Sequence, residues 1–264
     1  MMRNRKLSTI EKGKYHMKIR LEEKYTDPVT GGGNERWIKE KYQENCLLRM
    51  NHYAVMTIHI KNFRGYLLRY GKNASEEILK EFYDVTEGLL HENEWLSRIY
   101  SDHFVILLQR ESKEALVQFI YDTDWAGCQY PDPRTHLKIF YSFGVYMIDT
   151  PDDDFYTALN KAELARTMCS HVHLRNTSYD FYNSSTLKRY LLDCEIEEKA
   201  AEAVEKGRFI PYLQPKVRLS DEKIVGAEVL LRWFDENGKL IPLKDYLPVL
   251  DRNGYIRNVD LYIF

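Results

Sequence analysis

The sequence predicts an α/β protein in which helices pack on a sheet, followed by a second and shorter unit. Runs rich in β-branched and aromatic residues alternate with segments whose apolar residues recur every three or four positions. From residue 54 onward these elements follow the order β-α-α-β-β-α-β-α-β, which is typical of an α/β domain. Apolar content of 44% and charged content of 30% fit a folded globular chain.

The elements of the first unit can be placed by residue number. We expect residues 1–23 to form a basic lead-in helix or linker and residues 24–183 to form the first domain. Asn34 is a suitable N-cap, because its side-chain oxygen can accept a hydrogen bond from the first turn of a helix. The expected helices cover 35–48, 63–70, 74–91, 113–125 and 155–168, and the expected strands cover 54–60, 95–100, 104–109, 137–148 and 179–182.

The second unit begins after a charged helical connector at residues 184–207. Two apolar strands follow, at 209–217 and 224–234, and a short polar link joins them. A link of this length favours an antiparallel pair. Helical patterns then cover 243–251 and 256–264, so residues 208–264 read as the beginning of a domain.

Composition excludes several classes of protein. The net charge of −2 argues against a chain that binds a nucleic-acid polymer through a basic surface. No apolar run reaches the ~18–20 residues of a membrane helix, and the N-terminus lacks a signal-peptide core. These patterns predict a cytoplasmic protein with no membrane span. The four cysteines form no C-x-x-C pair, so we expect reduced thiols and no zinc site among them.

One strand of the second unit carries polar side chains that suggest chemistry. Glu228, Leu230 and Arg232 share one face, because side chains alternate along a strand. A Glu–Arg ion pair at a strand end is one interpretation. The other is a metal-binding carboxylate beside a phosphate-binding arginine, which suits metal-assisted hydrolysis of a phosphodiester. Gln214 in the preceding strand would lie nearby if the two strands pair.

The stretches YLQPKV (212–217), VGAEVLLRW (225–233), GKLIP (238–242) and YLPVL (246–250) together resemble the start of EAL domains, the cyclic di-GMP phosphodiesterases. The resemblance implies a TIM-like barrel in which Glu228 binds a catalytic Mg²⁺ or Mn²⁺. It also implies that Arg232 and the backbone near Leu230 contact cyclic di-GMP, and that Gln214 and Pro242 line its pocket.

A complete barrel of this kind needs ~250 residues. Residues 208–264 supply 57 of them, so the resemblance predicts an incomplete TIM-like EAL barrel. One glutamate cannot hold a two-metal site. We therefore expect the intact parent to hydrolyse cyclic di-GMP to the linear dinucleotide, and this truncated chain to be inactive.

The first domain resembles GGDEF domains, the diguanylate cyclase fold. The stretches DPVTGGGN (27–34) and IHIKNF (58–63) match that family's entry motif and metal-binding strand end. The stretch RIYSDHFVILL (98–108) falls on the signature hairpin. Asp102 and Phe104 agree with the signature, whereas its two glycines are Tyr100 and Ser101 and its glutamate is His103.

The departures predict a domain that does not make cyclic di-GMP. The first metal-binding aspartate corresponds to His59, which is a poor Mg²⁺ ligand. The base-reading asparagine corresponds to Leu67, which cannot hydrogen-bond guanine. We expect a regulatory or dimerising domain, with Tyr100 and His103 filling or capping the former pocket. Two alternatives stay open: His59, His103 and Asp102 bind a softer metal such as zinc, or the domain retains GTP as an input.

A rival interpretation assigns no enzymatic activity to either domain. Both would then be degenerate, and the protein would act as an effector or scaffold that binds cyclic di-GMP or GTP. Retained acidic metal ligands and a catalytic lysine in the remainder of an EAL domain would favour the enzyme, and their loss would favour the receptor.

Overall fold

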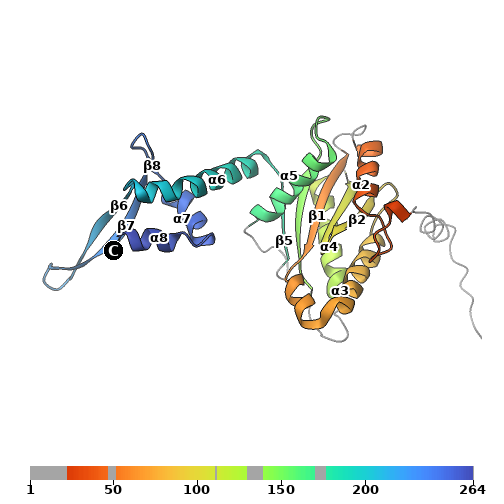
Figure 1. Cartoon of the computed structure of the whole chain (residues 1–264), viewed down its shortest axis with the longest axis horizontal. Coiled ribbons are helices and arrows are strands. Elements are labelled where there is room, and N and C mark those ends of the chain that lie inside the picture. The colour runs from red at the N-terminus through yellow and green to blue at the C-terminus, as the bar shows by residue number, and fades with distance from the viewer. Residues whose placement is uncertain (1–22, 47–51, 111, 130–138, 170–176, 264) are drawn as a thin grey trace, which may run out of the picture. The chain divides into compact units, whose positions relative to one another are not determined.

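The computed structural model divides the chain into two compact units, Met1–Asn183 and Ser184–Phe264 (Figure 1). It describes residues 23–46, 52–110, 112–129, 139–169 and 177–263. The predicted lead-in segment therefore lies almost entirely outside the described residues. Each unit has its own hydrophobic core.

The first unit is built on a mixed five-stranded sheet with the order β2-β3-β1-β4-β5. Neighbouring strands are antiparallel except β4 and β5, which are parallel. The predicted strands are confirmed, although β4 is shorter than expected. Their bounds are β1 Tyr53–Ile60, β2 Trp95–Tyr100, β3 His103–Gln109, β4 Tyr141–Met147 and β5 Ser178–Phe181.

The predicted helices of this unit are also confirmed, with two differences in detail. Asn34 caps the helix as expected, since its side-chain oxygen accepts a hydrogen bond from Trp37 N. That helix changes to a π-helical turn after Lys41, and Gly71 (φ 82°) kinks the long helix between its two predicted segments. The helical bounds are η1 Glu23–Tyr25, α2 Glu35–Lys41, η2 Tyr42–Cys46, α3 Phe63–Glu87, α4 Lys113–Gln129 and α5 Phe155–Met168.

The central strand β1 is buried on both faces, and its alternation divides the core into two layers (Figure 1). Ala54, Met56 and Ile58 face a cluster that includes side chains of α3 and α4. Tyr53 and Val55 face a second cluster that includes side chains of α2 and α5. By the same alternation, the next side chains on this second face near the strand end are Thr57 and His59.

Helix α5 lies very close to the sheet because β4 carries a glycine beneath it. A Cβ atom at Gly144 would lie 2.0 Å from the carbonyl oxygen of Ala162 and 2.6 Å from Cβ of Arg166. Ala158, Ala162 and Ala165 are fully buried, so small side chains line the helix face that meets the strand. This close approach brings charged side chains near the end of α5 close to the end of the central strand β1.

The second unit contains three helices and a three-stranded sheet of order β6-β7-β8. Strands β6 and β7 form the predicted antiparallel pair. Its core joins α6 to Phe209, Trp233 and Tyr246, whereas most of the β6–β7 hairpin is exposed. The bounds are α6 Ser184–Glu205, β6 Phe209–Val217, β7 Ile224–Phe234, β8 Leu240–Ile241, α7 Leu243–Arg252 and α8 Ile256–Ile263.

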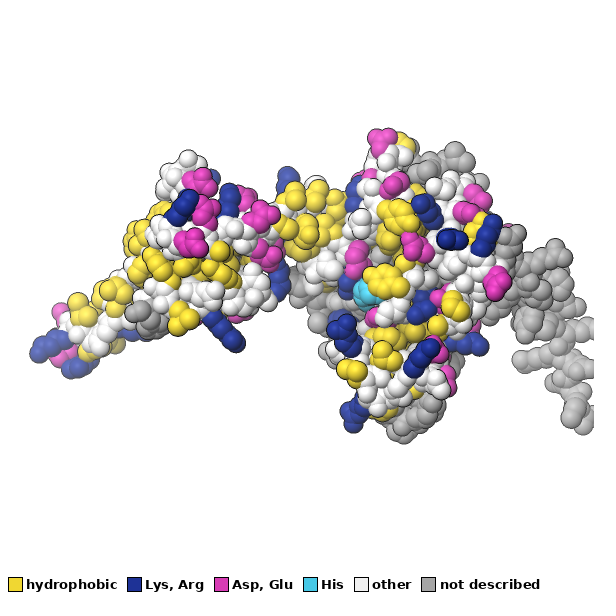
Figure 2. Space-filling view, in the orientation of Figure 1, with side chains coloured by type: hydrophobic (Ala, Val, Ile, Leu, Met, Phe, Trp, Pro, Cys, Tyr) yellow, Lys and Arg dark blue, Asp and Glu magenta, His cyan; other side chains and the backbone are white. Residues whose placement is uncertain are grey.

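Exposed apolar side chains distinguish this hairpin from an ordinary surface pair of strands. They include Tyr212, Leu213, Ile224 and Val229. Figure 2 shows hydrophobic side chains on the visible surface of the second unit. In the described ranges, none of the helices combines the length and the apolar character needed to cross a bilayer.

Candidate functional site

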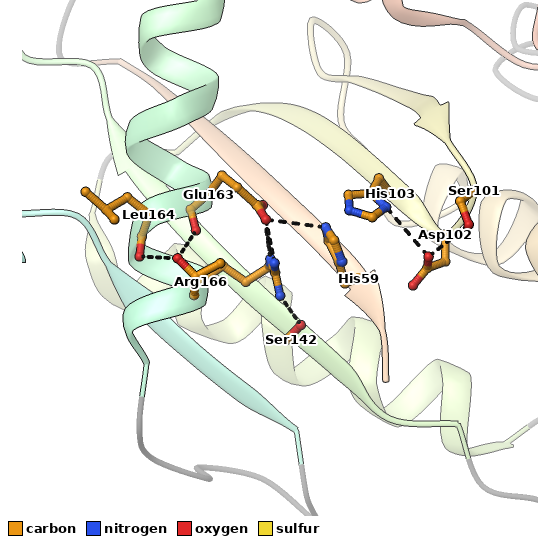
Figure 3. A network of polar contacts seen from close by, with 9 residues as sticks. His59, Ser101, Asp102, His103, Ser142, Glu163, Leu164 and Arg166 are labelled. Carbon is orange, nitrogen blue, oxygen red and sulfur yellow. Dashed lines mark hydrogen bonds and ion pairs between the residues drawn. The ribbon is translucent and has the colours of Figure 1, made fainter. Parts of the chain in front are cut away.

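The signature-like hairpin of the first unit places two histidines side by side. His59, near the end of β1, is the register partner of His103, the first residue of β3. Both side chains lie on the sheet face that carries α5, and their ring centroids are 3.2 Å apart at an interplanar angle of 67°. Figure 3 shows the two rings with Asp102 beside His103.

Asp102 completes a compact group of ligand-type atoms. Its Oδ1 lies 3.6 Å from His103 Nδ1. One nitrogen of each histidine and one oxygen of Asp102 all lie within 4.8 Å of one another. Within the described ranges this is the one group of three or more His, Cys, Asp or Glu side chains with such spacing.

Helix α5 contributes an ion pair to the same place. Arg166 Nε lies 3.0 Å from both carboxylate oxygens of Glu163, and Arg166 Nη1 donates to Ser142 Oγ at 3.1 Å. Glu163 Oε1 is 3.6 Å from His59 Nε2. Figure 3 shows this chain of contacts running from α5 across the sheet to His59.

Burial and neighbouring charges together set the protonation of the cluster. Burial and, after it, the Arg166 guanidinium lower the pKa of His59 to about 4, although the Glu163 carboxylate acts in the opposite direction. Burial alone would raise the pKa of Asp102 and Glu163. Nearby cationic or imidazole groups outweigh it, chiefly His103 for Asp102 and Arg166 for Glu163, so both pKa values lie below their ordinary range. At neutral pH the site therefore contains two carboxylates, one guanidinium and a neutral His59.

The turn of the hairpin is capped by an aromatic ring. Tyr100 stacks on His103 with ring centroids 4.1 Å apart, and it remains 59% exposed. Ser101 adopts a left-handed conformation with φ 46°, which favours glycine. Its carbonyl oxygen accepts a hydrogen bond from Arg98 Nε at 2.6 Å.

Arg98 also ties the hairpin to the loop that precedes α2. Its Nη1 lies 2.8 Å from Oδ2 of the buried Asp27. The other oxygen of Asp27 accepts hydrogen bonds from Thr30 N and Thr30 Oγ1, at 2.8 and 3.0 Å. The entry loop and the hairpin thus share one buried ion pair, which fixes the start of the domain against its signature turn.

The second unit places its predicted site residues on the β6–β7 pair. Glu228 and Gln214 are register partners, so their side chains lie on the same face. Glu228 is 55% exposed and its carboxylate lies 3.6 Å from Lys216 Nζ. Arg232 lies over the ring of Tyr212, 6.0 Å from its centroid, and donates to the carbonyl of Leu231. The alternative interpretation of this strand, an ion pair between Glu228 and Arg232, is not found between these two described residues, and Glu228 contacts Lys216 instead.

The remaining predicted positions in this unit are less closely grouped. Leu230 is the register partner of Tyr212 and follows Glu228 on the same strand face. Pro242 precedes α7 and lines a cavity of about 350 Å³ with side chains of α6, among them Glu195 and Lys199. Glu228 and Gln214 do not line that cavity.

Comparison with known proteins gives two domain matches. The model described as diguanylate cyclase, GGDEF domain, matches residues 24–169, more than half of the chain. The chain belongs to the GGDEF domain family. The EAL domain model matches residues 197–264. The predicted resemblance to a GGDEF domain followed by the first part of an EAL domain is therefore confirmed.

Two relatives match much of the chain at low identity. The cyclic di-GMP phosphodiesterase NbdA of Pseudomonas aeruginosa is 23% identical over 94% of this chain and 32% of its own length. The signaling protein YkoW of Bacillus subtilis is 22% identical over 80% of this chain and 27% of its own length. The chain spans less than a third of the length of these relatives.

A solved structure shares the fold across both units. The S helix-GGDEF-EAL portion of Vibrio cholerae LapD, bound to c-di-GMP, aligns with a TM-score of 0.61 at 18% identity. The alignment covers 97% of this chain and 60% of that one. At this identity the likeness shows the fold alone.

Sequence reasoning missed Glu163 and Arg166 of the GGDEF domain. They stand three residues apart on α5, and each directly follows a buried alanine, Ala162 or Ala165. A charged pair at that spacing beside two alanines of a packed helix face was the available signal. The pair reaches the site only because α5 packs closely on β4 at Gly144, and this packing cannot be inferred from the sequence without knowledge of the strand pairing.

Proposed function

We propose that this chain is part of a cyclic di-GMP signalling protein. Its GGDEF domain acts as a regulatory domain without diguanylate cyclase activity, and its EAL segment begins a phosphodiesterase domain. The observation that carries the proposal is the signature hairpin, where imidazoles and an aromatic ring occupy the positions that the resemblance assigns to magnesium and phosphate binding.

The chemistry of the hairpin argues against cyclisation of GTP. Mg²⁺ prefers oxygen ligands and holds the triphosphate through carboxylates. Here the hairpin and β1 offer Asp102, two imidazoles and no second carboxylate, while Glu163 is engaged by Arg166. The ring of Tyr100 lies over His103, where a glycine would leave the backbone open to a phosphate. The donor set therefore fits Mg²⁺·GTP poorly.

The proposed phosphodiesterase site lies on the β6–β7 pair. We assign Glu228 as the ligand of a divalent ion, Mg²⁺ or Mn²⁺, and Gln214, Leu230, Arg232 and Pro242 as contacts to cyclic di-GMP. The exposed carboxylate of Glu228 supports this assignment, because Lys216 contacts it only at 3.6 Å and at the surface. Among the described residues Glu228 belongs to no group of three or more ligand-type side chains, so further ligands would have to come from elsewhere in an EAL domain.

The cyclase half of the proposal is tested with the chain itself. The purified chain, incubated with GTP and Mg²⁺ beside an active GGDEF protein as a positive control, should release no cyclic di-GMP above the protein-free blank. Chromatographic detection of the dinucleotide is sufficient. Accumulation of cyclic di-GMP that depends on this chain would contradict the proposal.

The phosphodiesterase half is tested in the full-length protein that contains this chain. Glu228→Gln should abolish hydrolysis of cyclic di-GMP to the linear dinucleotide, because the amide is a far weaker metal ligand. Glu222→Gln, in the turn between β6 and β7, is the matched control and should keep wild-type turnover. Unchanged turnover in Glu228→Gln would show that the glutamate is structural. Binding without turnover in the wild-type protein would identify an effector instead of an enzyme.

A further inference from the structure

We propose that His59, His103 and Asp102 form a binding site for a first-row transition-metal dication, with Zn²⁺ as the probe. The proposed site goes beyond the signalling function above, since it needs neither GTP nor cyclic di-GMP. It would give the regulatory domain a metal input in place of the magnesium chemistry that its hairpin lacks.

The ligand chemistry of the three side chains suits a transition metal. Two imidazoles and one carboxylate suit Zn²⁺ and its first-row neighbours, whereas Mg²⁺ prefers a shell of oxygens. The three ligand atoms lie within 4.8 Å of one another. Ligands of a tetrahedral zinc ion lie about 3.3 Å apart, given Zn–N and Zn–O distances of about 2.0–2.1 Å. A small inward movement of the side chains would close the site, because His59 and His103 are register partners on the paired strands β1 and β3 and Asp102 directly precedes His103.

Two ring nitrogens of the cluster make no hydrogen bond. His59 Nε2 and His103 Nδ1 are buried and have no hydrogen-bond partner among the described residues. The carboxylate oxygens of Glu163 and Asp102 lie 3.6 Å from them, respectively. A buried polar atom without a partner costs about 1–3 kcal/mol. Their rings lie 3.2 Å apart, well inside the ~4.5–7 Å at which aromatic rings usually pair. A metal bound to both nitrogens would supply the missing partner for each.

The charge around the two histidines also favours a cation. Asp102 and Glu163 contribute two negative charges, and Arg166 contributes one positive charge that Glu163 already pairs. The pocket is therefore net negative when both imidazoles are neutral, which favours a cation over an anionic nucleotide. His103 and Asp102 remain partly accessible, with 24% and 15% of their side chains exposed, so an ion can enter and water can fill the fourth position.

The test is a metal titration of the whole chain after removal of metal with a chelator. Calorimetry with Zn²⁺ should give one site per chain that excess Mg²⁺ does not displace. His59→Gln, His103→Gln and Asp102→Asn should each lower the affinity for Zn²⁺ at least about 10-fold. Even the mutation of a residue that only hydrogen-bonds to a metal ligand lowers metal affinity about 10–100-fold. Co²⁺ bound to the wild-type chain should show the intense visible absorption of a low-coordinate ion, and the variants should lose it.

Two controls separate this site from adventitious binding. His52→Gln removes an exposed histidine outside the cluster, and the double variant His171→Gln/His173→Gln removes a second histidine pair of the sequence. Both should bind Zn²⁺ as the wild-type chain does. Circular dichroism in chelator checks that each variant folds, and Asp102→Asn keeps the test decisive if a histidine variant unfolds. Unchanged affinity in the folded cluster variants, or loss of the site in either control, overturns the proposal.

Discussion

Replacing His59 by glutamine should make the GGDEF domain less sensitive to acid. Burial holds the pKa of His59 at about 4 in the folded state, against about 6.5 in an unfolded chain. The groups that face it are Glu163 and Arg166 on α5, and Asp102 and His103 on the hairpin. As pH falls from 6.5 to 4, the unfolded chain takes up a proton that folded His59 refuses, so the free energy of unfolding decreases.

The magnitude follows from the width of that window. About 2.5 pH units at about 1.4 kcal/mol per unit give a loss of about 3 kcal/mol by pH 4, relative to neutral pH. Glutamine does not titrate, so His59→Gln should lack this part of the loss. Hydrogen exchange of amides in β1 and β3, measured in chelator near pH 7 and near pH 4, provides the local stability of the sheet. Comparing wild type and variant at the same pH cancels the intrinsic exchange rate. Equal losses of stability in the two proteins would refute the assignment of a buried, neutral His59.

Three further substitutions test the packing around the hairpin. Gly144→Ala should lower the free energy of unfolding by about 2–3 kcal/mol, measured by urea denaturation, because its Cβ would lie 2.0 Å from the carbonyl of Ala162; an unchanged midpoint would contradict the close approach. Ser101→Gly should raise the melting temperature, since it relieves up to about 1 kcal/mol of left-handed strain, and a fall would count against that conformation. Arg98→Met should lower the free energy of unfolding by about 3 kcal/mol, because it leaves the buried Asp27 without its ion-pair partner. The double variant with Asp27→Asn should recover part of this loss. A loss below about 1 kcal/mol in Arg98→Met would show that the ion pair behaves as a surface pair.

Much of the fold could be predicted because local signals and tertiary packing agree. The strand at β1 combines β-branched composition with burial on both faces, and Asn34 caps α2 as its residue type suggests. Gly71 separates the two helical patterns of α3 by adopting φ 82°, which only glycine reaches without strain. The change to a π-helical turn after Lys41 was not predictable. It buries Tyr42 and Cys46 against residues that are distant in sequence, and no local signal reveals those contacts.

The candidate site was only partly predictable, because residues distant in sequence come together to form it. Residue types and the hairpin motif single out His59, Asp102 and His103. Their closeness depends on the β1–β3 register, which pairs residues 44 positions apart. Glu163 and Arg166 reach the site only because Gly144 lets α5 approach β4. On the β6–β7 pair, alternation places Glu228 and Arg232 on one face, but the Lys216 contact depends on how the two strands pair.

The signature hairpin, as we describe it, does not form a magnesium–nucleotide site. A calorimetric titration of the whole chain with GTP in excess Mg²⁺, with an active GGDEF protein as the positive control, tests this directly. We expect no saturable heat for this chain. Saturable binding of Mg²⁺·GTP that His59→Gln and His103→Gln weaken would contradict it, because the nucleotide would then occupy the pocket where the imidazoles lie.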